Sequence, residues 1–198
     1  MEKVLVFDTE TTGLIPKRGR GYDNYEDYKK LDSYPRLLSI CWKVYLSDGT
    51  KISSNYFIVK PKDFIIDNDS VACKINGITK EISETGTDIF EIFKSFESSL
   101  EGVTKIIAHN ISFDSRIVKS ELYRYELHDL LSKFDDINKY CTCLNGKDLT
   151  QIKMKGWKDY KIPKLNELYK HLFNEDFDNA HNAEADVDAC ARCYFKMI

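Results

Sequence analysis

The stretch Phe7-Asp8-Thr9-Glu10-Thr11-Thr12-Gly13-Leu14 places two carboxylates directly after a short apolar run. That run, Val4-Leu5-Val6-Phe7, is continuous, apolar and contains two β-branched valines, which favours a strand buried on both faces. Asp8 and Glu10 are two residues apart, so the period of a strand puts both side chains on one face. Like charges buried side by side need a cation, and carboxylates are preferred ligands of hard divalent ions. The alternative is an ordinary polar turn that begins at Asp8 and is completed by Gly13.

Length and composition indicate one globular domain over residues 1–198. The chain has 42% hydrophobic and 31% charged residues, and no Gly/Ser/Pro-rich linker divides it. No apolar run approaches the roughly 18 residues of a membrane span, and no signal-peptide pattern precedes the first strand. We therefore expect a soluble, intracellular protein of the cytoplasm that has no membrane partner.

The six cysteines are too sparse for a disulfide scaffold, and free thiols in a reducing compartment are the simplest interpretation. An alternative is a zinc site formed by Cys141, Cys143, Cys190 and Cys193. Against that alternative, Cys190 and Cys193 fall on the apolar stripe of a helix, where small hydrophobic residues are expected.

The formal net charge of -3 argues against a protein that holds duplex nucleic acid by bulk electrostatics. Charge is not uniform, because residues 153–164 form a positive segment in which Trp157 and Tyr160 alternate with lysines. Such a segment can contact phosphates and stack on bases, or it can be a solvated lysine-rich loop.

Hydrophobic periodicity predicts an alternation of strands and helices after a long polar connection over residues 15–36. Strands are expected at residues 36–46 and 52–60, paired as a hairpin, and at residues 105–108 and 137–143. Helices are expected at residues 69–75, 87–100 and 113–125, shortly after residue 143, after Pro163, and from about Asn182 with Asp178 or Asn179 as the cap. This order implies an α/β fold with a mixed sheet and helices on both faces.

Two further acidic positions bear on the opening stretch. Asp114 stands where a helix follows a buried strand, a place that favours a carboxylate, and taken alone it fits an ordinary N-terminal helix residue better than a metal ligand. Five residues on an ideal helix turn through about 500°. His181 and Asp186 can therefore serve one centre only if His181 precedes the C-terminal helix or lies in its first turn. Asp186 stands beside the buried positions Val187 and Cys190, where a carboxylate requires a partner.

With these residues in place, the chain resembles the DEDDh 3′-to-5′ exonucleases, the DnaQ-like superfamily of polymerase proofreading subunits and ribonuclease T. The resemblance rests on residues 7–14, on Ala108-His109-Asn110-Ile111-Ser112-Phe113-Asp114, and on His181 followed by Asp186. It implies a ribonuclease-H-like fold with a five-stranded mixed sheet of order 3-2-1-4-5. It also implies that Asp8, Glu10, Asp114 and Asp186 hold two Mg²⁺ or Mn²⁺ ions and that His181 is the general base.

The same resemblance implies a substrate site. Thr11, Thr12, Gly13 and Leu14 would seat the terminal nucleotide with their backbone amides, Leu14 would contact the base, and Glu10 would meet the 3′-hydroxyl. His109 and Asn110 match the family's usual pair and would support the substrate, although a helix cap is the alternative for Asn110. In the connection over residues 15–36, Arg18, Arg20 and the tyrosines can grip a single strand.

The expected reaction is hydrolysis of phosphodiester bonds at the 3′ end of single-stranded nucleic acid, DNA in preference to RNA, with release of nucleoside 5′-monophosphates. Two ions roughly 3.5 to 4 Å apart stabilise the attacking and leaving oxygens, and His181 accepts a proton from water. Four carboxylates carry -4 and two ions +4, so the formal net charge of -3 becomes +1. Proofreading or DNA repair with a DNA polymerase, and a homodimer, are compatible with this activity. The alternative is a catalytically silent nuclease-fold module that binds nucleic acid or protein.

Overall fold

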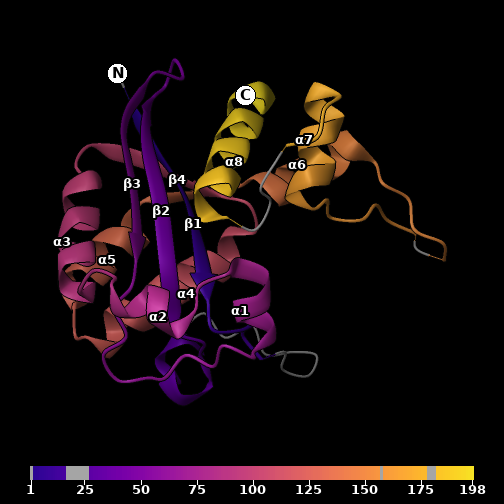
Figure 1. Cartoon of the computed structure of the whole chain (residues 1–198). Helices are drawn as coiled ribbons and strands as arrows, with labels where there is room; N and C mark the ends of the chain where they lie inside the picture. The colour runs from indigo at the N-terminus through magenta and orange to yellow at the C-terminus, as the bar shows by residue number, and fades with distance from the viewer. Residues whose placement is uncertain (1, 17–26, 157, 178–181) are drawn as a thin grey trace.

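A five-stranded sheet forms the centre of the computed structural model, which describes residues 2–16, 27–156, 158–177 and 182–198. The strands are β1 (Lys3–Thr11), β2 (Leu37–Leu46), β3 (Lys51–Ile58), β4 (Val103–Ala108) and β5 (Asn138–Cys141). Their order is β3-β2-β1-β4-β5, with antiparallel pairing from β1 to β3 and parallel pairing among β1, β4 and β5 (Figure 1). The predicted mixed sheet and its strand order are confirmed.

Helices cover both faces of this sheet, as predicted (Figure 1). The helices are α1 (Val71–Asn76), α2 (Lys80–Glu84), α3 (Ile89–Ser99), α4 (Ile111–Arg124), α5 (His128–Asp136), α6 (Thr142–Thr150), α7 (Leu165–Phe173) and α8 (Ala183–Met197), with short 3-10 turns η1 (Asp27–Lys29) and η2 (Leu31–Ser33). α3, α4 and α5 contribute to the larger core, and α8 packs on the opposite face. Within the described residues, none of these helices combines the length and apolarity needed to cross a bilayer.

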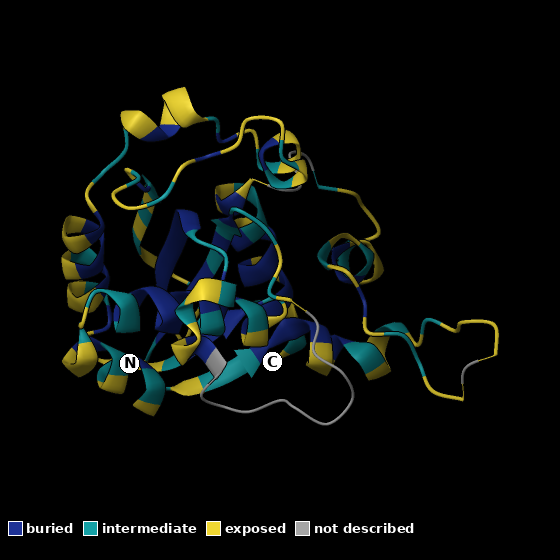
Figure 2. Ribbon diagram, turned by 90° about the horizontal axis from the view of Figure 1, so that it is seen from below, coloured by how far each residue is buried: buried dark blue, intermediate teal, exposed yellow. Residues whose placement is uncertain are grey.

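The alternation of side chains along β1 assigns its residues to two cores. Leu5 and Phe7 belong to the core shared with α3, α4 and α5, whereas Val4 and Val6 pack with α8. The buried sheet between partly exposed helices is visible in Figure 2. Because successive strand residues alternate in direction, Asp8 and Glu10 continue the α8 face and Thr9 continues the opposite one.

β1 is longer than the apolar run predicted. Asp8 and Glu10 lie inside the strand, because β2 stays paired with it as far as Thr11 opposite Leu37. β4, on the other side of β1, ends at Ala108 and pairs with β1 only as far as Val6. The last part of β1 therefore has a strand on one side only, and its open edge meets Asp114 in the first turn of α4.

Two helices were missing from the prediction. α2 is a short helix of five residues, and α5 follows α4 after a turn at Glu126, which has a φ of 58°. A non-glycine residue in this left-handed region gave no boundary signal in the sequence. Leu130 and Phe134 nevertheless carry the helical spacing that buries α5.

The predicted caps of α8, Asp178 and Asn179, are wrong. The helix begins at Ala183, and the side chain of Asn182 accepts hydrogen bonds from the N–H groups of Glu184 and Ala185. An amide oxygen this close to the first free N–H groups satisfies the helix start at Asn182 itself.

The prediction that the tyrosines of the polar connection contact a single strand of nucleic acid is wrong for two of them. Tyr28 and Tyr34 are buried in the larger core, where Tyr28 packs edge-on against Tyr123. Tyr28 thus anchors the connection to α4, and because both rings are buried they are not available to a substrate.

Candidate active site

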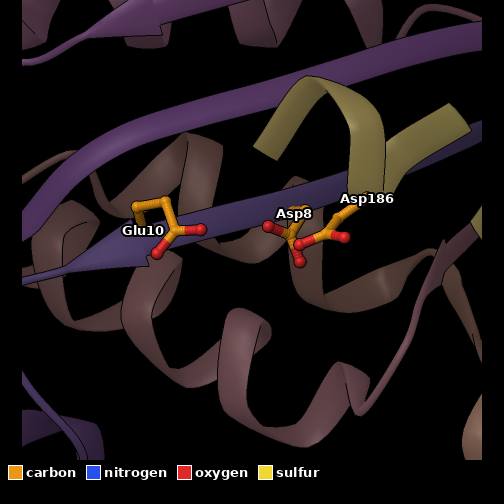
Figure 3. Close-up of side chains that lie close together, drawn as sticks. All are labelled: Asp8, Glu10 and Asp186. Carbon is orange, nitrogen blue, oxygen red and sulfur yellow. The ribbon is translucent and has the colours of Figure 1, made fainter. Parts of the chain in front are cut away.

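Three carboxylates gather at the open end of β1. Asp8 and Glu10 project from β1 toward α8, and Asp186 projects toward them from the first turns of α8 (Figure 3). One oxygen from each lies within 4.8 Å of the others, and all three residues are half-buried. Within the described residues, this is the one group of three or more acidic, histidine or cysteine side chains placed to hold a metal ion.

Asp114 approaches the same strand from the other side. It lies in the first turn of α4 and is 3% exposed. Its Oδ1 accepts hydrogen bonds from the hydroxyl of Thr9 at 2.7 Å and from the N–H of Thr9 at 3.1 Å. Asp114 thus takes the place of the strand partner that β1 lacks beyond the end of β4, which satisfies a buried backbone donor.

The carboxylates repel one another because they lie close together and are partly buried. Burial, followed by repulsion from Asp114, Asp186 and Glu10, raises the pKa of Asp8 well above its ordinary value. Burial and the charges of Asp186 and Asp114 raise the pKa of Glu10 to about 7. Burial also raises the pKa of Asp114, although the hydrogen bonds from Thr9 oppose that shift. A divalent cation would relieve this repulsion, and an all-oxygen donor set fits Mg²⁺ or Mn²⁺.

A cavity of about 560 Å³ opens on the Glu10 side of the group, and we call it the nucleotide cavity, after the ligand that the sequence resemblance predicts for residues 11–14. One wall is the stretch from Thr9 to Leu14, and the other is α1 with Phe113. Leu14, Val71 and Ile75 are 81%, 74% and 57% exposed, which leaves apolar side chains facing solvent around a carboxylate. This combination suits a ligand with one flat apolar part and one hydrogen-bond donor such as a hydroxyl group.

A second cavity of about 750 Å³ opens on the side of Asp8 and Asp186. We call it the strand cavity, where strand means the nucleic-acid strand expected from the sequence resemblance and not a β-strand. Its lining includes His109, Asn110 and the residues that lead into α7, among them Ile162, Pro163 and Lys164. The three carboxylates therefore lie between two cavities, with one cavity on the Glu10 side and the other on the side of Asp8 and Asp186.

The predicted pair His109 and Asn110 lines the strand cavity, but the two residues differ in burial and in hydrogen bonding. Nε2 of His109 lies 3.1 Å from the carbonyl oxygen of Pro163 and Nδ1 lies 2.9 Å from the hydroxyl of Thr142. A carbonyl only accepts, so Nε2 carries the proton and the Thr142 hydroxyl donates to Nδ1. Burial lowers the pKa of His109 to about 4, so the ring is neutral at pH 7. Asn110 is exposed, has a φ of 67° and makes no side-chain cap to α4.

Almost the whole chain matches a known protein family. The exonuclease family RNase_T matches residues 5–194, nearly the whole chain. The chain belongs to this exonuclease family. The resemblance inferred from the three motifs is confirmed, and the enzyme class expected from it, a nuclease of the hydrolase type, is confirmed at the level of the family.

Relatives of this exonuclease domain occur inside longer proteins. The chain is 24% identical over its whole length to the 3′-5′ exonuclease DinG of Bacillus subtilis (strain 168) and 27% identical to a PolC-type DNA polymerase III of Mycoplasmopsis pulmonis (strain UAB CTIP). It spans only 18% and 12% of those proteins. A zinc-ion-bound complex of E. coli ExoI with ssDNA shares the fold, with a TM-score of 0.72 and 19% identity over 98% of this chain and 40% of that one.

Two residues that the sequence did not single out contact the residues of this candidate site. Asn76, at the end of α1, donates to the carbonyl oxygen of Thr11 at 3.3 Å and hydrogen-bonds Glu10, which opposes the rise in the pKa of Glu10. The backbone of Arg36 forms two hydrogen bonds with Thr12, both at 2.9 Å. Its carbonyl oxygen accepts from the Thr12 N–H, and its N–H donates to the Thr12 hydroxyl. The Thr12 amide is thus engaged by the protein, contrary to its predicted contact with a nucleotide. In sequence Asn76-Gly77 indicated only a helix end, and Arg36 only a strand start.

Several predicted residues lie outside the described residues: His181, Arg18, Arg20 and Trp157. For the zinc alternative, Cys141 and Cys143 have their sulfurs 3.3 Å apart, but Cys193 belongs to a separate cluster with α7. Among the described residues no group of three thiols is placed to hold a metal, so the structure lends the zinc site no support.

Proposed function

We propose that this chain is a divalent-metal-dependent 3′-to-5′ exonuclease that releases nucleoside 5′-monophosphates from the ends of single-stranded DNA. The observation that carries the proposal is the group of Asp8, Glu10 and Asp186 between two cavities. DNA is proposed ahead of RNA because the similar ExoI structure is a complex with ssDNA.

In this proposal Asp8, Glu10, Asp114 and Asp186 hold two Mg²⁺ or Mn²⁺ ions. Bound ions supply Lewis-acid stabilisation of charge on the phosphate and make water a better nucleophile at neutral pH. The raised pKa values of Asp8 and Glu10 support a cation at this place, since ionised carboxylates are costly there without one.

The terminal nucleotide occupies the nucleotide cavity, with its base between Leu14 and the α1 residues Val71 and Ile75. Glu10 accepts a hydrogen bond from the 3′-hydroxyl, which selects a strand end over an internal nucleotide. Asn76 orients Glu10 for this contact through its side-chain amide. The scissile phosphate then lies over Asp8 and Asp186, and the rest of the strand leaves through the strand cavity.

His181 is the proposed general base. An ordinary histidine pKa near 6.5 suits proton removal from water at neutral pH. α8 begins at Ala183, so His181 precedes that helix in the chain, which is the condition under which it and Asp186 can serve one centre. His109 is no candidate for this role, since both of its ring nitrogens are engaged within the protein.

We also propose that the domain acts in the reducing cytoplasm and alongside a DNA polymerase, in proofreading or repair. All six cysteines are free thiols, which suits a reducing compartment. The similarity to a PolC-type polymerase supports the choice of partner. Co-purification of the chain with the polymerase of its own cell is the test, and its absence under mild salt would contradict the partnership.

The decisive experiment uses 5′-labelled and 3′-labelled single strands of DNA and RNA with Mg²⁺ or Mn²⁺. The wild-type chain should shorten 5′-labelled DNA one nucleotide at a time and release mononucleotides from the labelled 3′ end. Asp8→Asn should abolish cleavage with the fold intact, because it removes one ligand charge and its repulsion. His181→Asn should lower kcat on the order of 10²-fold while divalent-ion binding persists.

Asp48→Asn is the matched control, since Asp48 lies in the turn between β2 and β3 and Asn keeps the acceptor for the Thr50 N–H. Binding without cleavage by the wild-type chain with either ion would favour the silent module and contradict the proposal. Cleavage by Asp8→Asn at the wild-type rate would contradict the assignment of the site.

A further inference from the structure

The segment of residues 153–164 is the most positively charged part of the chain, and we call it the basic arm. It contains five lysines and one aspartate, a formal charge of +4, so the remaining residues together carry -7 when the whole chain carries -3. Of the arm, the structure describes residues 153–156 and 158–164. Figure 1 shows these parts, between α6 and α7, projecting well away from the sheet, and Figure 2 shows most of them exposed.

The base of the basic arm is a built structure. The N–H of Lys161 donates to the carbonyl oxygen of Ile152 at 2.8 Å, which joins the two limbs. Lys161 pairs with Glu167 of α7 at 2.5 and 2.7 Å, and Lys147 of α6 pairs with Asp159, the one acid of the arm. Both α6 and α7 are thereby tied to the arm.

These pairs use the acid of the arm and one of its five lysines. Lys153, Lys155, Lys158 and Lys164 are exposed, and none of them forms an ion pair with another described residue. A set of like charges kept on a projecting segment is unfavourable by itself, and a polyanion would relieve the repulsion among them.

The C-terminal end of the basic arm lies at the rim of the strand cavity. Ile162, Pro163 and Lys164 are the last residues of the arm and line the cavity that also contains Asp8 and Asp186. The hydrogen bond from His109 to the carbonyl oxygen of Pro163 fixes this rim to the end of β4. A chain of phosphates that leaves the carboxylates through the strand cavity therefore meets the basic arm next.

We propose that the basic arm binds the sugar-phosphate backbone of the substrate strand upstream of the bond that is cleaved. This inference rests on the proposed function, because it takes the terminal nucleotide to fill the nucleotide cavity. Lys153, Lys155 and Lys158 contact phosphates, and the exposed side chains of Met154 and Ile162 contact sugars or bases. The arm thus offsets the repulsion of a polyanion by an acidic domain. With limbs of about six residues it reaches at most roughly 20 Å from the rim, so it acts only on strands longer than a dinucleotide.

The test compares two triple variants of the full chain. The arm variant is Lys153→Gln/Lys155→Gln/Lys158→Gln, which spares Lys164 because that residue lines the cavity. The control is Lys51→Gln/Lys94→Gln/Lys196→Gln, which removes the same charge from exposed positions on β3, α3 and α8. Cleavage of a single strand of about 20 nucleotides and of a dinucleotide is measured with Mg²⁺, over a series of salt concentrations.

For the arm variant we expect KM on the long strand to rise about tenfold, kcat to stay unchanged, and the salt slope of log KM to fall by about 2, since each lost phosphate contact removes about 0.7. The control variant should match the wild type, and both variants should cleave the dinucleotide alike. Equal KM values for arm and control on the long strand would overturn the proposal. So would an equal loss on the dinucleotide, which would mean that the substitutions disturb the carboxylate site.

A binding measurement separates this inference from the proposed function. Anisotropy of a fluorescent long strand, in EDTA so that cleavage is absent, should show about tenfold weaker binding by the arm variant than by the control. That difference would support the arm even if the wild-type chain cleaved nothing. Equal binding would overturn the arm even if the chain were a fully active exonuclease.

Discussion

Thr9 illustrates how one side chain between two acids holds the site together. Its neighbours Asp8 and Glu10 face α8, so Thr9 faces the opposite way and meets Asp114 of α4. The two hydrogen bonds from Thr9 fix the Asp114 carboxylate beside β1 and stabilise its charged form. A residue that binds no ion thus determines where one of the proposed ligands lies.

Replacement of Thr9 by valine should weaken Mn²⁺ binding by about tenfold, within the 10- to 100-fold range typical of residues that orient metal ligands. Valine keeps the shape and the backbone N–H and removes only the hydroxyl donor. Calorimetric titration with Mn²⁺ measures the change, with Thr104→Val on the exposed face of β4 as the control. Unchanged affinity would show that the hydroxyl does not orient Asp114.

His109 gives the protein a defined response to acid. Its pKa falls from 6.5 in the unfolded chain to about 4 in the folded one, so at intermediate pH only the unfolded chain binds the proton. The contribution to stability is therefore complete above pH 6.5 and is lost as the pH falls toward 4. Between pH 7.5 and pH 5 the loss amounts to about 2 kcal/mol for this shift.

Urea unfolding at those two pH values, with wild type and His109→Gln, isolates this contribution. The amide of glutamine does not titrate, so the variant should lose about 2 kcal/mol less than the wild type. Parallel pH profiles for the two proteins would show that His109 is not held neutral by the fold.

At the scale of elements, α4 links the start of β2 to the active site. Its first turn carries Asp114, and two turns later the buried Glu121 accepts hydrogen bonds from Arg36 Nε at 2.9 Å and from the Leu37 N–H at 3.2 Å. Arg36 in turn holds Thr12 through its backbone. One helix thereby fixes both Asp114 and the floor of the nucleotide cavity.

Glu121→Ala should lower the free energy of unfolding by about 3 kcal/mol, because the largely buried Arg36 loses its buried carboxylate partner and keeps only Tyr125 and the half-exposed Asp63. Glu121→Gln should cost less, since the amide oxygen can still accept from Leu37. Chemical denaturation measures both, with exposed Glu97→Ala on α3 expected to stay within about 0.5 kcal/mol of wild type. A loss for Glu121→Ala no larger than the control's would contradict the role of this pair.

At the scale of the whole molecule, charge is divided between an acidic domain and a basic projection. The formal charge of -3 hides -7 outside the basic arm and +4 within it. Four of the negative charges lie in the active site, so ion binding changes the balance where the substrate arrives. Metal binding at the proposed site would therefore be coupled both to folding and to the attraction of the substrate.

Divalent ions should stabilise the fold. At a concentration of 100 times Kd, Mg²⁺ or Mn²⁺ adds about 2.7 kcal/mol, or roughly 5 to 10 °C in Tm for a chain of this size. At one fixed ion concentration, the gain in the free energy of unfolding should be larger at pH 8 than at pH 6. Protons compete with the ions at the lower pH for carboxylates whose pKa values are raised. Thermal melts with added ion or EDTA measure it, and the same gain in Asp8→Asn would show that the ions bind elsewhere.

Sequence patterns predicted those features that depend on local order. Residues 4–7 predicted a buried strand, helical spacing predicted α3, α4 and α8, and three separated motifs predicted the family and the strand order. α5 was missed because the boundary between α4 and α5 lies at Glu126, which adopts a left-handed backbone conformation. A glycine at that position would have indicated the end of a helix. The end of β1 was placed too early because pairing with β2, which is distant in sequence, extends the strand through the acids.

By itself the sequence determined the kinds of residue in the site, since charge, apolar period and motif order are properties of the chain. Only the tertiary structure decided their arrangement. It brought Asp186 to Asp8 and Glu10, gave Asp114 the open edge of β1, and engaged His109 in bonds to Thr142 and Pro163. The physical reason is that every backbone donor and every buried charge must find a partner in space, and which partner is near depends on how the strands and helices pack.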